Sequence, residues 1–256
     1  MAGEIRVGTS GWQYDDWRGA FYPEGMATRR WLAHYASTFS TVEVNATFYR
    51  PASESSVRDW SETVPAGFEF ACKGSRFITH QKKLNDPAEP IERYFEPLAP
   101  LADRLAVVLW QLPPRWRRNP GRLDEFLAAL PAGPRYAVEL RDDDWFHDET
   151  YEVLDRHGAA LVWLSSSLTT AHHEHVRTGD HVYLRFHGLD EDEPYRYDYT
   201  RRELEPWAQR LREVADEATP AWVYFNNDHE AKAVANARTL VELLGEAARP
   251  WPPTQE

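Results

Sequence analysis

The chain has 256 residues, of which 42% are hydrophobic, and its formal net charge is −12 at pH 7. It is long enough for a large core, and its acidic balance opposes indiscriminate binding to nucleic acid or to an anionic membrane surface. A single cysteine, Cys72, excludes a disulfide framework and a zinc site built from several cysteines.

Eight short runs of apolar, β-branched and aromatic residues predict buried strands. In chain order they span residues 5–10, 41–46, 68–73, 105–111, 136–141, 160–165, 181–187 and 222–226. Between most of them lie stretches with apolar residues at helical spacing, at 29–38, 123–130, 151–157, 203–217 and 230–244. Residues 77–100, which contain four prolines, are expected to form an inserted loop with short helical pieces.

Strands that alternate with helices are typical of a parallel sheet, and eight such units in about 250 residues predict a barrel. We therefore expect an α/β fold, a single TIM-like (β/α)8 barrel over residues 1–256, with a loosely ordered tail at about 247–256. An open doubly wound sheet is the alternative, but the glycines of Gly8-Thr9-Ser10-Gly11 do not have the dinucleotide-binding spacing. Because no segment approaches the ~20 apolar residues of a membrane span and residues 1–7 do not resemble a leader, we expect a soluble cytoplasmic protein.

Polar side chains recur on one face of the predicted strands, near their C-terminal ends. In residues 41–46, for example, Glu43 and Asn45 alternate with Val42 and Val44. Side chains alternate between the two faces of a strand, and the C-terminal ends of barrel strands meet at one mouth. The pattern predicts a polar, charged interior at that mouth, formed by Glu43, Asn45, Lys73, Gln111, Glu139, Arg141, Arg185, His187, Asn226 and Asn227.

This set of residue types indicates a pocket for a small polar anion. Arg141, Arg185 and Lys73 are suited to binding phosphate or carboxylate oxygens. The asparagines and Gln111 would orient a polar ligand, and aromatic rings near the mouth would stack on it. The rings expected to do so are Trp12, Tyr49 and Trp145.

Four residues of the set are candidates for catalysis. Glu139 and Glu43 are the candidate acid and base, and His187 could carry a proton near neutral pH. Lys73 could form a Schiff base with a carbonyl substrate. The alternative is a self-paired ion network, with pairs of the type Glu139–Arg185 and Glu43–Arg141 and with Lys73 paired to Glu43.

No cofactor is predicted. A divalent metal is less favoured, because Glu43, Glu139, His187 and Asp228 are acceptable ligand types but no helix carries a His-Glu-x-x-His spacing. The run His172-His173-Glu174-His175 is better explained as a solvated loop, since consecutive histidines cannot all face one ion.

Motifs in order along almost the whole chain resemble those of the YecE-like family, proteins with a domain of unknown function, number 72. They include Gly8-Thr9-Ser10-Gly11-Trp12, Glu43-Val44-Asn45, Leu109-Trp110-Gln111-Leu112-Pro113-Pro114, Glu139-Leu140-Arg141, Leu184-Arg185-Phe186-His187-Gly188 and Tyr224-Phe225-Asn226-Asn227-Asp228. The resemblance implies a TIM-like barrel similar to the xylose isomerase and endonuclease IV group, without an established activity. One departure is Ser165, which stands where the family commonly has an aspartate.

Three functions are compatible with these observations. The first is an enzyme that acts on a sugar phosphate or sugar acid by acid–base chemistry, that is, isomerisation, elimination or hydrolysis. The second is a protein that interacts with nucleic acid or processes phosphodiesters, with basic residues such as Arg76 and Arg118 at the rim of the mouth. The third is a non-catalytic ligand sensor. The sequence predicts no membrane partner and does not determine the oligomeric state.

Overall fold

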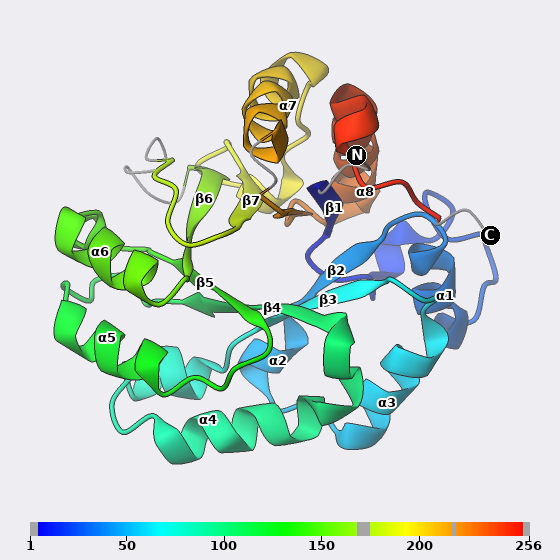
Figure 1. The fold of residues 1–256 in the computed structure, drawn as a ribbon. Coiled ribbons are helices and arrows are strands. Elements are labelled where there is room, and N and C mark those ends of the chain that lie inside the picture. The colour runs from blue at the N-terminus through cyan, green and yellow to red at the C-terminus, as the bar shows by residue number, and fades with distance from the viewer. Residues whose placement is uncertain (1–4, 168–174, 217–218, 253–256) are drawn as a thin grey trace.

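The computed structural model describes residues 5–167, 175–216 and 219–252. Eight parallel strands form one sheet with the order β1-β8-β7-β6-β5-β4-β3-β2, which curls into a nearly closed barrel (Figure 1). The strands are β1 (Ile5–Thr9), β2 (Thr41–Val44), β3 (Glu69–Lys73), β4 (Leu105–Gln111), β5 (Arg135–Glu139), β6 (Ala160–Ser166), β7 (Val182–Gly188) and β8 (Ala221–Phe225). The predicted TIM-like barrel is confirmed.

Helices surround the strands. They are α1 (Trp31–Ala36), α2 (Ala46–Tyr49), α3 (Glu54–Thr63), α4 (Ala88–Phe95), α5 (Pro120–Ala128), α6 (Asp148–Arg156), α7 (Arg201–Asp216) and α8 (Lys232–Leu244). Helix α3 was not predicted, because its ten residues bury only Val57 and so give little apolar periodicity. The predicted insertion after β3 is confirmed as short helical pieces, a π-helical turn at Phe77–Gln81, α4, and a 3-10 segment at Glu96–Arg104.

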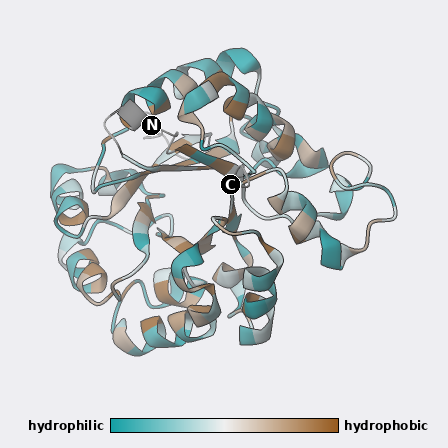
Figure 2. Cartoon of the chain, turned by 45° about the vertical axis from the view of Figure 1, so that its right-hand side comes forward, coloured by the Kyte–Doolittle hydropathy of each residue, from teal (hydrophilic) through white to brown (hydrophobic). Residues whose placement is uncertain are grey.

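Apolar side chains fill two layers. The larger layer lies between strands and helices, and Cys72 belongs to it, as its place on the strand predicts. The smaller layer fills the barrel interior with Ala71, Val107, Leu109, Ala137, Ala160, Val162, Leu164, Tyr183, Trp222 and Tyr224. Figure 2 shows the corresponding pattern, with hydrophobic residues on the strands and hydrophilic residues along the outer sides of the helices.

Residues 248–251, part of the expected loose tail, contact the barrel. The backbone N–H of Arg249 donates to the carbonyl of Ile5 at 2.8 Å, and its guanidinium contacts Glu69 at 2.5 Å. The indole N–H of Trp251 donates to the carbonyl of Ala36 at 2.8 Å. These contacts attach the segment to the N-terminal end of the barrel, which composition alone did not indicate.

The barrel closes at a seam between β1 and β2. There the strands share one isolated bridge, Ser10 to Glu43, in place of a ladder. The hydroxyl of Tyr35 spans the gap, accepting from the N–H of Thr9 at 2.9 Å and donating to the carbonyl of Thr41 at 3.0 Å. A side chain at Gly8 would lie 2.3 Å from that carbonyl, so the close approach of the two strands requires glycine there.

We expect Tyr35→Phe to lower the free energy of unfolding by about 1–3 kcal/mol, because two buried backbone groups lose a partner. Urea denaturation measures the change. Tyr49→Phe is the matched control, since the Tyr49 side chain is 76% exposed and its loss of a hydroxyl should have little effect. Equal stability of the two variants would show that Tyr35 does not hold the seam.

Candidate functional site

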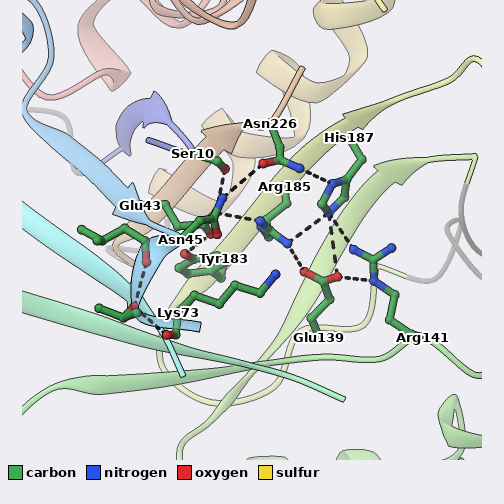
Figure 3. Close-up of polar contacts among 12 residues, drawn as sticks. Ser10, Glu43, Asn45, Lys73, Glu139, Arg141, Tyr183, Arg185, His187 and Asn226 are labelled. Carbon is green, nitrogen blue, oxygen red and sulfur yellow. Dashed lines mark hydrogen bonds and ion pairs between the residues drawn. The ribbon is translucent and has the colours of Figure 1, made fainter. Parts of the chain in front are cut away.

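The guanidinium of Arg185 lies inside the barrel between two carboxylates from other strands (Figure 3). Its Nη2 donates to Oε1 of Glu43 on β2 at 2.7 Å, and its Nη1 donates to Oε2 of Glu139 at the end of β5 at 2.5 Å. All three side chains are at most 1% exposed. A charge so far from water is costly unless it is paired, and here each charge has a partner of opposite sign.

Arg141 completes a group that we call the buried quartet, Glu43, Glu139, Arg141 and Arg185. The Nε of Arg141 donates to Oε1 of Glu139. Burial by itself would raise the pKa of Glu139, but the guanidiniums of Arg141 and Arg185 hold it well below its usual range. Two carboxylates and two guanidiniums make the quartet neutral, and the predicted alternative pair Glu139–Arg185 is present, whereas Glu43 pairs with Arg185 rather than Arg141.

Glu43 is bound by three partners within the protein. Besides Arg185, it accepts hydrogen bonds from the hydroxyl of Ser10 at 2.6 Å and from that of Tyr183 at 2.6 Å. Tyr183 stands two residues before Arg185 on β7, on the same inner face. Glu43 therefore joins β1, β2 and β7 at the point where the barrel closes.

His187 lies against the quartet and is neutral. Burial, together with the charges of Arg185 and Arg141, lowers its pKa to about 3. Its Nε2 lies 3.1 Å from Nη2 of Arg141 and 3.2 Å from Nη1 of Arg185. Guanidiniums only donate, and on the other side of the ring Nδ1 lies 3.0 Å from Nδ2 of Asn226, so both ring nitrogens face N–H donors. Such a ring does not exchange protons near pH 7, so this environment favours a positioning role over the expected proton carrier.

A cavity of approximately 860 Å³ lies at the C-terminal mouth, with the quartet at its floor. Eight of the predicted site residues line it, Asn45, Tyr49, Lys73, Gln111, Arg141, Arg185, His187 and Asn226. Glu43 and Glu139 are fully buried beneath its wall. Seven residues complete the lining, Tyr14, Phe48, Arg76, His80, Pro114, Tyr195 and Asp228.

Three predicted residues lie away from this wall. Trp12 packs edge-on against Trp60 at 5.6 Å, and the indole of Trp145 donates to the carbonyl of Trp116 at 2.5 Å. The amide of Asn227 donates to Asn236 at 2.7 Å. Asn227 follows Asn226 directly and so faces the helices, which the alternation of side chains could have indicated. The two indoles are buried because their large apolar surface packs between loops and helices.

Lys73 differs from the other interior charges because it lacks an ion pair. Within the parts of the chain that the structure describes, no carboxylate lies within 4.0 Å of its Nζ, so the alternative pair with Glu43 is absent. Nζ lies 4.4 Å from the ring centre of Phe48. Burial and the charge of Arg185 lower the pKa of Lys73 to about 8. Its amine therefore titrates close to neutral pH.

Arg76 and His80 reach the cavity from the π-helical segment after β3. Burial, Lys73 and Arg76 lower the pKa of His80 to about 4, so this imidazole is neutral as well. In the sequence, their position just beyond the end of a barrel strand is what indicates that they lie near the mouth. Tyr195, from the segment after β7, also lines the cavity.

Comparison with known proteins identifies the family to which the chain belongs. A family model described as "Protein of unknown function DUF72" matches residues 6–256. The chain belongs to this family. It is 26% identical to the UPF0759 protein YunF of Bacillus subtilis, over 94% of both chains. It is 27% identical to the UPF0759 protein YecE of Escherichia coli, over 94% of this chain and 92% of YecE.

A crystal structure supports the same assignment. The chain is similar to a DUF72 family protein from Thermotoga maritima, with a TM-score of 0.84, 30% identity, and coverage of 94% of this chain and 98% of the other. A DUF72 family protein from Enterococcus faecalis has a TM-score of 0.78 at 20% identity, which concerns the fold alone. The YecE-like resemblance is confirmed.

Ser165, the departure expected from the resemblance, does not line the cavity. The hydroxyl of Ser165 lies 3.0 Å from that of Tyr199, on the outer face of β6. No cluster of three or more histidine, cysteine, aspartate or glutamate side chains suited to a metal ion occurs in the described ranges. Residues 172–174 of the histidine-rich run lie outside those ranges.

No helix in the described part of the chain is both long enough and apolar enough to cross a membrane.

Replacement of one quartet member should be costly. We expect Glu139→Gln to lower the free energy of unfolding by about 3–5 kcal/mol at pH 7, because Arg141 and Arg185 keep their charges and lose a shared carboxylate. Guanidinium chloride denaturation measures the loss. The control is Glu149→Gln, whose carboxylate is 59% exposed and lies 3.5 Å from Arg118, so its loss should cost less than about 1 kcal/mol. If the free energy of unfolding falls equally little in both variants, Glu139 is not part of a stabilising network.

Proposed function

We propose that the cavity binds a small molecule with a phosphate or carboxylate group, and that the protein is an enzyme acting on it. This proposal rests on the excess of cationic over anionic side chains in the cavity wall. Of the charged lining residues, Lys73, Arg76, Arg141 and Arg185 are cations and Asp228 is the carboxylate. Since the buried quartet is neutral, Lys73 and Arg76 give the cavity a net positive charge even with Asp228 ionised.

The uncharged part of the wall suits a hydroxylated ligand. Asn45, Gln111 and Asn226 present amide groups, which donate and accept hydrogen bonds. Tyr14 and Phe48 add aromatic surface of the kind that packs against a sugar ring. A sugar phosphate or sugar acid combines the features that this wall would bind.

The expected acid–base role of Glu43 and Glu139 is better assigned to Lys73. Both carboxylates are fully buried and already bonded, so neither is poised to exchange a proton with a ligand. They hold Arg185 and Arg141 in place instead. The pKa of Lys73, about 8, lies in the range in which a general base or acid is effective at neutral pH.

A nucleic-acid ligand is the second candidate. Tyr49, Arg76 and Phe77 line a second pocket that shares Tyr49 and Arg76 with the cavity, and Tyr49 and Phe77 are 76% and 48% exposed. Exposed aromatic rings beside an arginine can stack bases and bind phosphate. The net charge of −12 opposes association with a long polyanion, so this reading favours a short or terminal segment.

Isothermal titration calorimetry with inorganic phosphate, a panel of sugar phosphates and sugar acids, and a short single-stranded oligonucleotide tests the proposal. We expect one small-anion class to bind, and Arg76→Gln to weaken it by about tenfold, since a charged hydrogen bond contributes about 1.5 kcal/mol. Arg58→Gln is the control, because Arg58 is a similarly exposed arginine that pairs with Glu54 away from the cavity.

Equal affinity of Arg76→Gln and Arg58→Gln for the anion would contradict binding at this wall. Tighter binding of the oligonucleotide than of every small anion would favour the second candidate. Any small anion that binds is then assayed for turnover, and tight binding without product would indicate a ligand sensor instead of an enzyme.

A further inference from the structure

We propose that Lys73 is a nucleophile that forms an imine with the carbonyl group of an anionic aldehyde or ketone. This inference rests on the proposed function, because the anionic group is what would hold the carbonyl near Nζ. It narrows the substrate class to molecules that carry both a carbonyl and a phosphate or carboxylate, such as a sugar phosphate in its open-chain form or a 2-oxo acid.

The position of Lys73 is the first argument. It is the last residue of β3, and its own carbonyl accepts a hydrogen bond from the hydroxyl of Thr47 at 2.7 Å, which fixes the backbone at the mouth. The side chain runs along the cavity wall and contacts the ring of Phe48 at 4.4 Å. Figure 3 shows its amine pointing toward Glu139 and Arg185.

The use of the interior carboxylates is the second argument. A lysine that served only to balance charge would be expected to pair with Glu43 or Glu139, which are nearby. Both instead bind arginines, and in the described ranges Nζ has no carboxylate within 4.0 Å. An amine that is largely buried, lies against an aromatic ring and is subject to the charge of a neighbouring arginine has the environment that activates a lysine as a nucleophile.

The lowered pKa of Lys73 increases the fraction of its side chains that carry a free amine. With a pKa of about 8, roughly a quarter of the Lys73 side chains carry a free amine at pH 7.5, against about 0.1% for a lysine that titrates at 10.5. The reactive form is therefore more abundant by a factor of about 200. Arg141, which contributes to this shift, also lines the wall where the anionic group of the substrate would bind.

The step balances in atoms and charge. The lone pair of Nζ forms a bond to the carbonyl carbon while the carbonyl π electrons move to oxygen. Proton transfer from nitrogen to that oxygen gives a carbinolamine, which loses water as the C=N bond forms. Overall, one ammonium and one carbonyl give one protonated imine and one water. The positive charge next to the substrate carbon then stabilises a carbanion at the neighbouring position, which suits aldol cleavage or dehydration.

Reductive trapping with glyoxylate and sodium cyanoborohydride tests this directly. The chain has four lysines, Lys73, Lys82, Lys83 and Lys232, so the last three are internal controls in the same sample. Peptide mass spectrometry measures carboxymethyl-lysine at each position over time. We expect Lys73 to react at least tenfold faster than the other three at pH 7.5, with a second-order rate constant that rises with pH to a midpoint near 8.

Two comparisons separate imine formation from anion binding. Acetaldehyde lacks the carboxylate, so it should label Lys73 much more slowly than glyoxylate, and inorganic phosphate should slow glyoxylate labelling. Lys73→Arg keeps the positive charge and lacks the nucleophile, so position 73 should not be labelled while phosphate affinity falls less than in Lys73→Met.

Labelling of Lys73 no faster than that of Lys82 would overturn the inference. If phosphate still bound in that case, with weaker binding in Lys73→Met, the proposed function would stand and Lys73 would be a binding cation only. Rapid labelling by acetaldehyde and glyoxylate alike, in a protein that binds no phosphate, would support the nucleophile and contradict the anion site.

Discussion

The fold buries one arginine almost completely inside the barrel, and the site follows from how that charge is paired. Arg185 is on β7, Glu43 on β2 and Glu139 on β5, so the two ion pairs cross the barrel. Removal of either carboxylate would leave the buried guanidinium with one fewer counter-charge in an interior of low dielectric constant, which is costly. The same contacts join β7 to the seam at which β1 and β2 approach each other, because Glu43 also binds Ser10.

This pairing divides the charges of the mouth into two groups. The buried quartet is internally neutral and forms the floor of the cavity, with His187 held as a neutral ring against it. Lys73 and Arg76 remain in the wall, where the structure offers them no carboxylate of the quartet. The net charge of the cavity therefore comes from Lys73 and Arg76, which the carboxylates of the quartet do not neutralise. A positive wall above a fixed neutral floor favours an anionic ligand without requiring the floor to rearrange when it binds.

The sequence predicted the barrel and most of the wall because both depend on local pattern. Alternation along a strand places Asn45, Gln111, Arg141 and His187 on the inner face, and the parallel topology brings strand ends to one mouth. The same alternation would have excluded Asn227. The burial of Trp12 and Trp145 could not be predicted, since it depends on how loops pack over the helices.

Contacts between distant residues were beyond the sequence. The residue types allowed Glu43 to pair with Arg141, Arg185 or Lys73, and the choice depends on the stagger of strands around the barrel. That choice decides whether the glutamates face a ligand or lie beneath the floor. Arg76 was expected at the rim of the mouth, but His80 was missed for a related reason, because the path of the chain after β3 follows a π-helical turn that has no simple periodic pattern.

A crystal structure of the protein with tungstate, a heavy tetrahedral oxyanion, would test the central claim most directly. We expect an anomalous peak in the cavity, within hydrogen-bond distance of Nζ of Lys73 or the guanidinium of Arg141. Glu43 and Glu139 should remain bonded to Arg185. Tungstate bound only outside the cavity, or a glutamate displaced from Arg185 by the anion, would contradict it.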